Sequence, residues 1–144
     1  MRTKFLMIGI SCLLMSCILV ALANAEMAGY QTQRTDYPEV PRISAFEAKQ
    51  LYKLGRLVLA DANYAGEYEW KHISGSKSYP GNRLQLYRTL PRDRIVAFYC
   101  DGIGDAVAAK AAAYYWHQGY NKVRVVSGGS SMLQRAGFKM WYRK

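Results

Sequence analysis

The sequence of 144 residues predicts an α/β fold in which a central parallel sheet carries helices on both faces. Short continuous apolar runs, typical of strands that are buried on both sides, alternate with segments of helical periodicity. Glycines stand between these segments, where the chain must turn. In parallel sheets of this kind ligands bind where strands end and helices begin, so we expect a functional site at that edge.

The predicted elements begin after residue 43. Ser44 and Glu47 form a potential capping box, and the helix that they start is expected to end at Gly55. The remaining elements are strands at 57–61, 95–99 and 123–126, a weaker strand at 76–79, a helical turn at 84–87, a helix at 105–118 and a last helix that follows Gly128-Gly129.

Residues 1–25 are predicted to be a secretory signal peptide. Arg2 and Lys4 precede an unbroken apolar run over 5–22, and small residues then follow, as cleavage before Glu26 requires. Cleavage would remove two basic residues and no acidic ones, which lowers the formal net charge from +10 to +8. A positive surface outside the cytoplasm favours anionic small molecules, anionic lipids or acidic proteins, and we expect no nucleic-acid partner.

Two alternatives to cleavage remain open. The run 5–22 is just long enough to stay in the membrane as an anchor. The residues before Cys17 loosely resemble a lipoprotein box, so a lipoprotein with its lipid on Cys17 is the second alternative. In all three cases the globular part is expected outside the cytoplasm, most simply in the periplasm. The polar stretch 26–42 is expected to be a tether, and 43–144 the domain.

Cys100 is the candidate nucleophile. Cys12 and Cys17 would leave with the signal peptide, so one cysteine remains, and it follows the central strand predicted at 95–99. Positive φ angles at the two loop glycines would turn backbone amides inward as an anion nest, and the next helix adds its positive end. Both effects favour thiolate. The predicted substrate-binding groups are the amides of Asp101, Gly102, Ile103, Gly104 and Asp105. The alternative is a small buried hydrophobe.

Several short motifs surround this loop in a recognisable order. They are Asp61 at a strand end, Glu67-Tyr68, His72-Ile73-Ser74-Gly75, Leu90-Pro91, the cysteine strand, Gly119-Tyr120 and Gly128-Gly129. As an ordered set, over about 42–144, they resemble a single rhodanese-like domain.

The resemblance implies a sulfurtransferase. Cys100 would take a sulfane sulfur from a donor such as thiosulfate, hold it as a persulfide, and pass it to a thiol or cyanide. Asp61 and His72 are supporting candidates: Asp61 would orient the loop or bind a neighbouring turn, and His72 would act as a proton shuttle or be structural. With His117 as the only other histidine, we expect no zinc site and no cofactor.

The loop departs from the family pattern. Family loops that use thiosulfate usually carry a cation near the loop end, where this chain has Asp105-Ala106, and Asp101 adds a second carboxylate. Negative charge disfavours thiolate and an anionic donor, so we expect weak turnover on thiosulfate and a gain from Asp105→Arg. Asp105 has a second interpretation, as a helix cap. The phosphatases that share this fold need an arginine at position 106, which excludes that activity.

Further departures are Asn63, where the family often has arginine or glutamate, and Lys71, where it often has glycine. They leave a non-catalytic rhodanese-like binding module as the alternative to the enzyme. The tail "KMWYRK", residues 139–144, mixes aromatic and basic side chains. Its two interpretations are weak contact with a membrane surface and a frayed terminus.

Overall fold

The computed structural model describes residues 37–86, 89–101 and 103–144. The expectations for the signal peptide and for residues 26–36 of the tether concern residues outside these ranges. Among the described residues, no helix has both the length and the apolar character needed to cross a bilayer.

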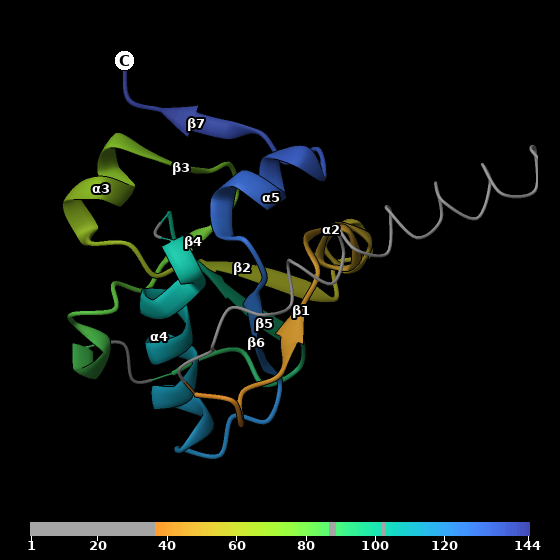
Figure 1. The fold of residues 1–144 in the computed structure, drawn as a ribbon, viewed down its shortest axis with the longest axis vertical. Coiled ribbons are helices and arrows are strands. Elements are labelled where there is room, and N and C mark those ends of the chain that lie inside the picture. Colours follow the sequence, from red (N-terminus) through yellow and green to blue (C-terminus); the bar gives the residue numbers. More distant parts are fainter. Residues whose placement is uncertain (1–36, 87–88, 102) are drawn as a thin grey trace, which may run out of the picture. The chain divides into compact units, whose positions relative to one another are not determined.

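A five-stranded parallel sheet forms the centre of the described chain (Figure 1). Its strand order is β1-β6-β5-β2-β4, and every neighbouring pair is parallel, which confirms the predicted parallel sheet. The strands are β1 (Arg42–Ile43), β2 (Leu57–Asp61), β4 (Lys77–Ser78), β5 (Ile95–Tyr99) and β6 (Val123–Val126). Since β5 is third of the five, the residue that follows it lies at the middle of the sheet's carboxyl edge.

Helices cover both faces of this sheet, as predicted. The helices are α2 (Ala45–Lys53), α3 (Ala65–Trp70), α4 (Ala106–Trp116) and α5 (Gly129–Arg135), with 3-10 turns at Leu84–Leu86 and Ile103–Asp105. Side chains alternate along β5, so Val96 and Phe98 pack with α4, whereas Ala97 and Tyr99 pack with α2 and α5. Figure 1 shows α4 on one side of the sheet and α2 with α5 on the other.

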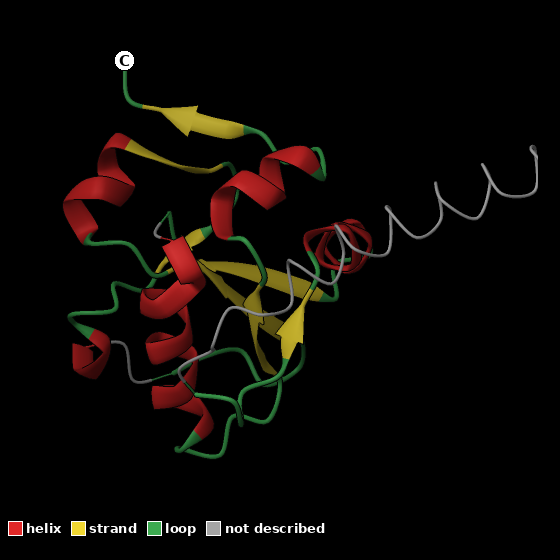
Figure 2. Cartoon of the chain, in the orientation of Figure 1, coloured by secondary structure: helices red, strands yellow, loops and turns green. Residues whose placement is uncertain are grey.

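A second, antiparallel sheet was not predicted. It pairs β3 (Lys71–Ile73), which follows α3 directly, with β7 (Met140–Tyr142) (Figure 2). The inner residue Ile73 is fully buried, and Met140 opposite it packs against the same core cluster as α2 and α5. The frayed interpretation of the tail is therefore wrong for residues 140–142.

The start of α4 differs from the prediction. The helix expected from residue 105 begins at Ala106, after a 3-10 turn. Gly104 and Asp105 have φ angles of 81° and 57°, and such left-handed residues cannot continue a right-handed helix. The start of α2 follows the prediction in part, because Ser44 Oγ accepts the Glu47 amide at 3.2 Å.

Candidate functional site

Cys100 directly follows β5 at the carboxyl edge of the main sheet, where it was expected. It is 1% exposed and belongs to the core cluster on the α4 side. Its carbonyl oxygen accepts the Ser130 amide at 3.1 Å. Gly129, whose φ is 55°, lies so close to that oxygen that any Cβ there would overlap it. The backbone at the start of α5 therefore packs against the Cys100 carbonyl, and only glycine fits at position 129.

The predicted amide nest is described in part. Gly104 has the expected positive φ, and Gly102 lies outside the described residues. The Asp101 amide donates to Asn63 Oδ1 at 3.0 Å, so it is already engaged by the protein and is not available to a substrate anion. The expectation of five amides open to substrate is thus corrected for Asp101, because Asn63 anchors the first residue of the loop.

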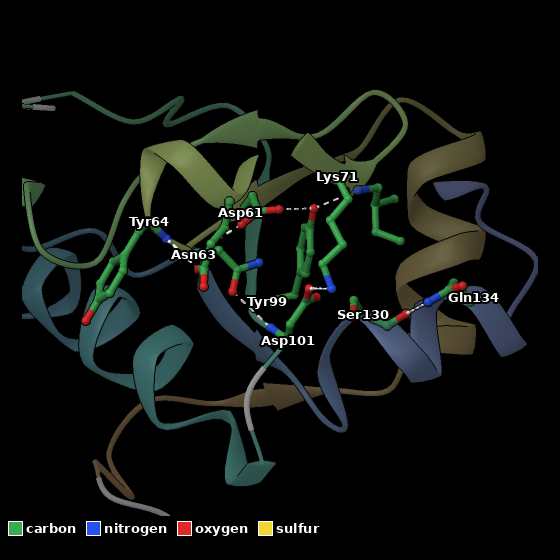
Figure 3. Close-up of polar contacts among 10 residues, drawn as sticks. Asp61, Asn63, Tyr64, Lys71, Tyr99, Asp101, Ser130 and Gln134 are labelled. Atoms are coloured by element: carbon green, nitrogen blue, oxygen red, sulfur yellow. Dashed lines mark hydrogen bonds and ion pairs between the residues drawn. The ribbon is translucent and has the colours of Figure 1, made fainter. Parts of the chain in front are cut away.

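A buried hydrogen-bond network lies behind the loop (Figure 3). The Tyr99 hydroxyl donates to Asp61 Oδ2 at 2.5 Å and accepts the Ile73 amide at 2.9 Å, and it lies 3.0 Å from Ser76 Oγ. Asp61 Oδ1 accepts the Asn63 amide at 2.9 Å. We call these contacts the Tyr99 network. It joins β5 and β2 to the turn after β3, and through Asn63 it reaches the cysteine loop.

Burial governs the ionisation of this network. Burial raises the pKa of Asp61 above its usual value, and the hydrogen bonds from Tyr99 and Asn63 oppose that shift. Burial and the neighbouring Asp61 carboxyl raise the pKa of Tyr99 far above its usual value. Tyr99 therefore stays a neutral hydrogen-bond donor, and Asp61 acts on the site by orienting the Asn63 turn.

Lys71 compensates the charge of Asp101. Its Nζ lies 2.7 Å from Asp101 Oδ2, and Figure 3 shows the side chain reaching from β3 toward the loop. Burial raises the pKa of Asp101, but the hydrogen bonds from Lys71 and Ser130 outweigh it and hold that pKa below its usual value. The carboxylate next to Cys100 is thus paired with a cation that is 30 positions away in the sequence, so no local pattern indicates the pair.

Arg42 plays the same part for Asp105. Its Nη1 lies 2.9 Å from Asp105 Oδ2, which also accepts the Gly128 amide at 3.0 Å. Asp105 makes no side-chain hydrogen bond to its own helix, so its interpretation as the cap of α4 is wrong. Instead it ties the loop to β1 and to the start of α5. Since Asp105→Arg would bring two guanidinium groups together and lose the Gly128 contact, the gain expected from that variant no longer follows.

His72 is engaged outside the loop. Its ring stacks on Tyr68 with centroids 4.0 Å apart and on Trp141 at 4.7 Å, and its Nδ1 lies 2.8 Å from the Tyr68 carbonyl oxygen. These contacts hold the ring within the second sheet, which favours the structural role over that of proton shuttle.

An open hollow lies beside the loop. Asn63, Tyr64, Glu67, Asp101 and Val107 line it, so it borders the loop at Asp101. Two of its lining residues, Glu67 and Asp101, are acidic, and Asp101 is paired with Lys71. No group of three histidine, cysteine or carboxylate side chains that could hold a metal ion occurs in the described ranges.

Sequence reasoning missed three of the residues that shape the site. Tyr99 carried a signal, because a tyrosine in a strand buried on both faces needs a partner for its hydroxyl. Arg42 carried none, since 63 positions separate it from Asp105. In the sequence Lys71 stands out only as a departure from the family pattern, because its ion pair with Asp101 depends on how β3 is placed.

One comparison with known proteins shows the family. The family model of the rhodanese-like domain matches residues 44–136. No match was found among curated protein sequences.

Solved structures give the same fold. A rhodanese-like domain from Anabaena sp. is 20% identical, with a TM-score of 0.62 over 72% of this chain and 80% of its own. A protein from Bacillus halodurans is 21% identical, with a TM-score of 0.62 over 83% of this chain and 86% of its own. A thiosulfate sulfurtransferase from Pseudomonas aeruginosa is 25% identical, with a TM-score of 0.62 over 72% of this chain but 20% of its own.

Proposed function

Because the chain belongs to the rhodanese-like domain family, we propose that it is a sulfurtransferase or sulfur carrier that works through a persulfide of Cys100. The Cys100 thiolate attacks the outer sulfur of thiosulfate, the S–S bond of the donor breaks, and sulfite leaves with the electron pair. A thiolate or cyanide then attacks the terminal sulfur of the persulfide and releases the Cys100 thiolate. No external oxidant or reductant is needed.

The position of Cys100 carries this proposal. The sulfur follows the central strand and precedes a short turn into α4, whose amino-terminal end favours negative charge. Pairing of Asp101 with Lys71 and of Asp105 with Arg42 gives further support, because both carboxylates of the loop are compensated. An anionic donor therefore meets less repulsion than the sequence alone suggested.

The test is the mass of the intact protein after incubation with thiosulfate. The wild type should gain one sulfur atom, which cyanide or a thiol then removes, and Cys100→Ser should gain none. Ser131→Ala, at an exposed position of α5, is the matched control and should behave like the wild type. A wild-type protein that gains no sulfur from thiosulfate or from a polysulfide donor would overturn the proposal.

The burial of the sulfur favours a second candidate function. At 1% exposed, Cys100 also suits a rhodanese-like binding module in which the cysteine only fills space. Alkylation separates the two candidates. A binding module would show slow alkylation of Cys100 and no sulfur uptake, and Cys100→Ala would leave its behaviour unchanged.

We also propose that the protein is exported, on the strength of residues 1–25. Material from the cell envelope should have the mass of a chain that begins at Glu26. A mass that includes residues 1–25 would favour the membrane anchor, and a lipid on Cys17 would favour the lipoprotein. Recovery of the intact chain from the cytoplasm would contradict all three.

A further inference from the structure

The outer face of the second sheet combines aromatic and cationic side chains. His72 lies directly opposite Trp141 in the antiparallel register, and the neighbouring pair, Ile73 and Met140, packs into the core. Because side chains alternate along a strand, His72 and Trp141 point away from the core. Trp70, the last residue of α3, and Arg143, which follows β7, adjoin this face, since the Arg143 amide donates to the Trp70 carbonyl at 2.9 Å. We call Trp70, His72, Trp141 and Arg143 the aromatic face.

The side chains of the aromatic face are held in place. The His72 ring is stacked between Tyr68 and Trp141. The guanidinium of Arg143 lies 5.5 Å from the centroid of the Trp70 ring, within the range of a cation–π contact. Ordered rings lose little conformational entropy on binding, so this face is prepared for contact with a partner.

The two tryptophans of the face remain exposed all the same. Trp70 is 65% exposed and Trp141 is 42% exposed, whereas Trp116 packs partly buried against the core. Two exposed tryptophans on one small face leave a large apolar surface in water. Such a surface on a soluble domain marks a binding site.

Cationic side chains predominate around the face. Neither β3 nor the tail 139–144 contains an acidic side chain, and the tail contributes Lys139, Arg143 and Lys144. The nearest carboxylates in sequence are on α3: Glu67 accepts the Tyr64 amide, and Glu69, beside Trp70, is exposed. Aromatic rings beside arginine and lysine are the side chains that settle at the headgroup level of a bilayer.

We propose that the aromatic face docks the domain on the surface of an anionic lipid bilayer. Trp70 and Trp141 would enter the headgroup region, and Arg143 with the lysines of the tail would meet lipid phosphates. The size of the face favours lipid over a protein partner. Each of its two strands has three residues and is roughly 10 Å long. The area of these two strands is therefore far below the about 800 Å² that each partner buries in a stable protein complex. The docking does not depend on the sulfur chemistry of Cys100.

Tryptophan fluorescence tests the docking on the protein as it is recovered from the cell, with or without its N-terminal residues. Residues 1–36 contain no tryptophan, so the emission reports on the domain whether or not the apolar run is retained. Trp116→Phe leaves Trp70 and Trp141 as the reporters. With vesicles of phosphatidylglycerol and phosphatidylethanolamine, their emission should shift to the blue and bromine-labelled lipids should quench it. Vesicles of phosphatidylcholine alone should produce neither change.

Charge variants in the same background identify the surface. Arg143→Gln combined with Lys144→Gln should reduce binding to the anionic vesicles roughly fivefold for each cation removed. If the chain keeps its apolar run, that run holds it on the vesicles, and the double variant should instead lower the fraction of tryptophan emission that the brominated lipids quench. The matched control, Lys53→Gln with Lys110→Gln, removes two exposed cations from α2 and α4 and should change neither quantity. Absence of lipid quenching in the parent protein, or equal losses in both double variants, would overturn the proposal.

Discussion

The two aspartates of the cysteine loop make the same kind of contact in different surroundings. Asp101 pairs with Lys71 near solvent, where the two side chains are 27% and 48% exposed. Asp105 pairs with Arg42 in a largely buried position, where the aspartate side chain is 5% exposed, and it also binds the Gly128 amide. One end of the loop therefore faces the hollow, and the other is bonded to β1 and to the residue before α5.

This difference separates stability from chemistry. A buried carboxylate that loses its cation keeps the full cost of its desolvation, whereas an exposed one is rescued by water. The Asp105 end should therefore govern how firmly the loop is held. The Asp101 end should govern the charge that an incoming donor meets.

The largest effect is expected in the Tyr99 network, which supports the Asp101 end from behind through Asn63. Tyr99→Phe leaves the buried Asp61 carboxylate and the Ile73 amide without their shared partner. We expect the free energy of unfolding to fall by about 3 kcal/mol in urea titrations. Tyr114→Phe, on the exposed side of α4, should cost almost nothing. Equal losses would mean that the buried network does not support the site.

Arg42→Met should measure how much the Asp105 end of the loop contributes to stability. It leaves Asp105 without its cation in a site that water reaches poorly. We expect a loss of about 2 kcal/mol in unfolding free energy, less than for a fully buried pair because Arg42 is itself 27% exposed. If Arg42→Met cost no more than Lys71→Met, the contrast between the two ends would fail.

Lys71→Met should affect chemistry more than stability. The lost pair is partly exposed, so the free energy of unfolding should fall by less than about 1 kcal/mol. Sulfur uptake from thiosulfate should slow by up to about tenfold, because the Asp101 carboxylate beside Cys100 is then uncompensated. Uptake is followed by the intact mass over time. Lys77→Met, at an exposed position of β4, is the control and should leave the rate unchanged.

The smallest effect expected is a dependence of stability on pH through Asp101. Its pKa in the folded protein lies below the usual 3.8, because the bonds from Lys71 and Ser130 outweigh burial. As the pH falls, the unfolded chain binds the proton first, so the stability that ionised Asp101 contributes is present above pH 3.8 and is lost below it. The difference in unfolding free energy between wild type and Asp101→Asn should thus be smaller at pH ~3 than at pH ~7. A difference that stays constant would rule this out.

Much of the fold could be predicted because its main strands can be recognised from neighbouring residues alone. The runs at 57–61, 95–99 and 123–126 are strands over the predicted residues, since a strand buried on both faces needs a continuous apolar run. The position of Cys100 followed from one of them. In contrast, β3 and β7 have three residues each and show no alternation, so neither carried a pattern that could be recognised before the two were paired.

The sequence by itself determined the α/β class, the rhodanese-like family and the thiol at the end of the central strand, because these depend on neighbouring residues and on the order of short motifs. Only the tertiary structure decided the electrostatics of the loop. From the sequence, Asp101 and Asp105 read as uncompensated charges beside the cysteine. Their cations come from β1 and β3, which lie far from them along the chain and beside them in space, and Coulomb interactions depend on that spatial distance alone.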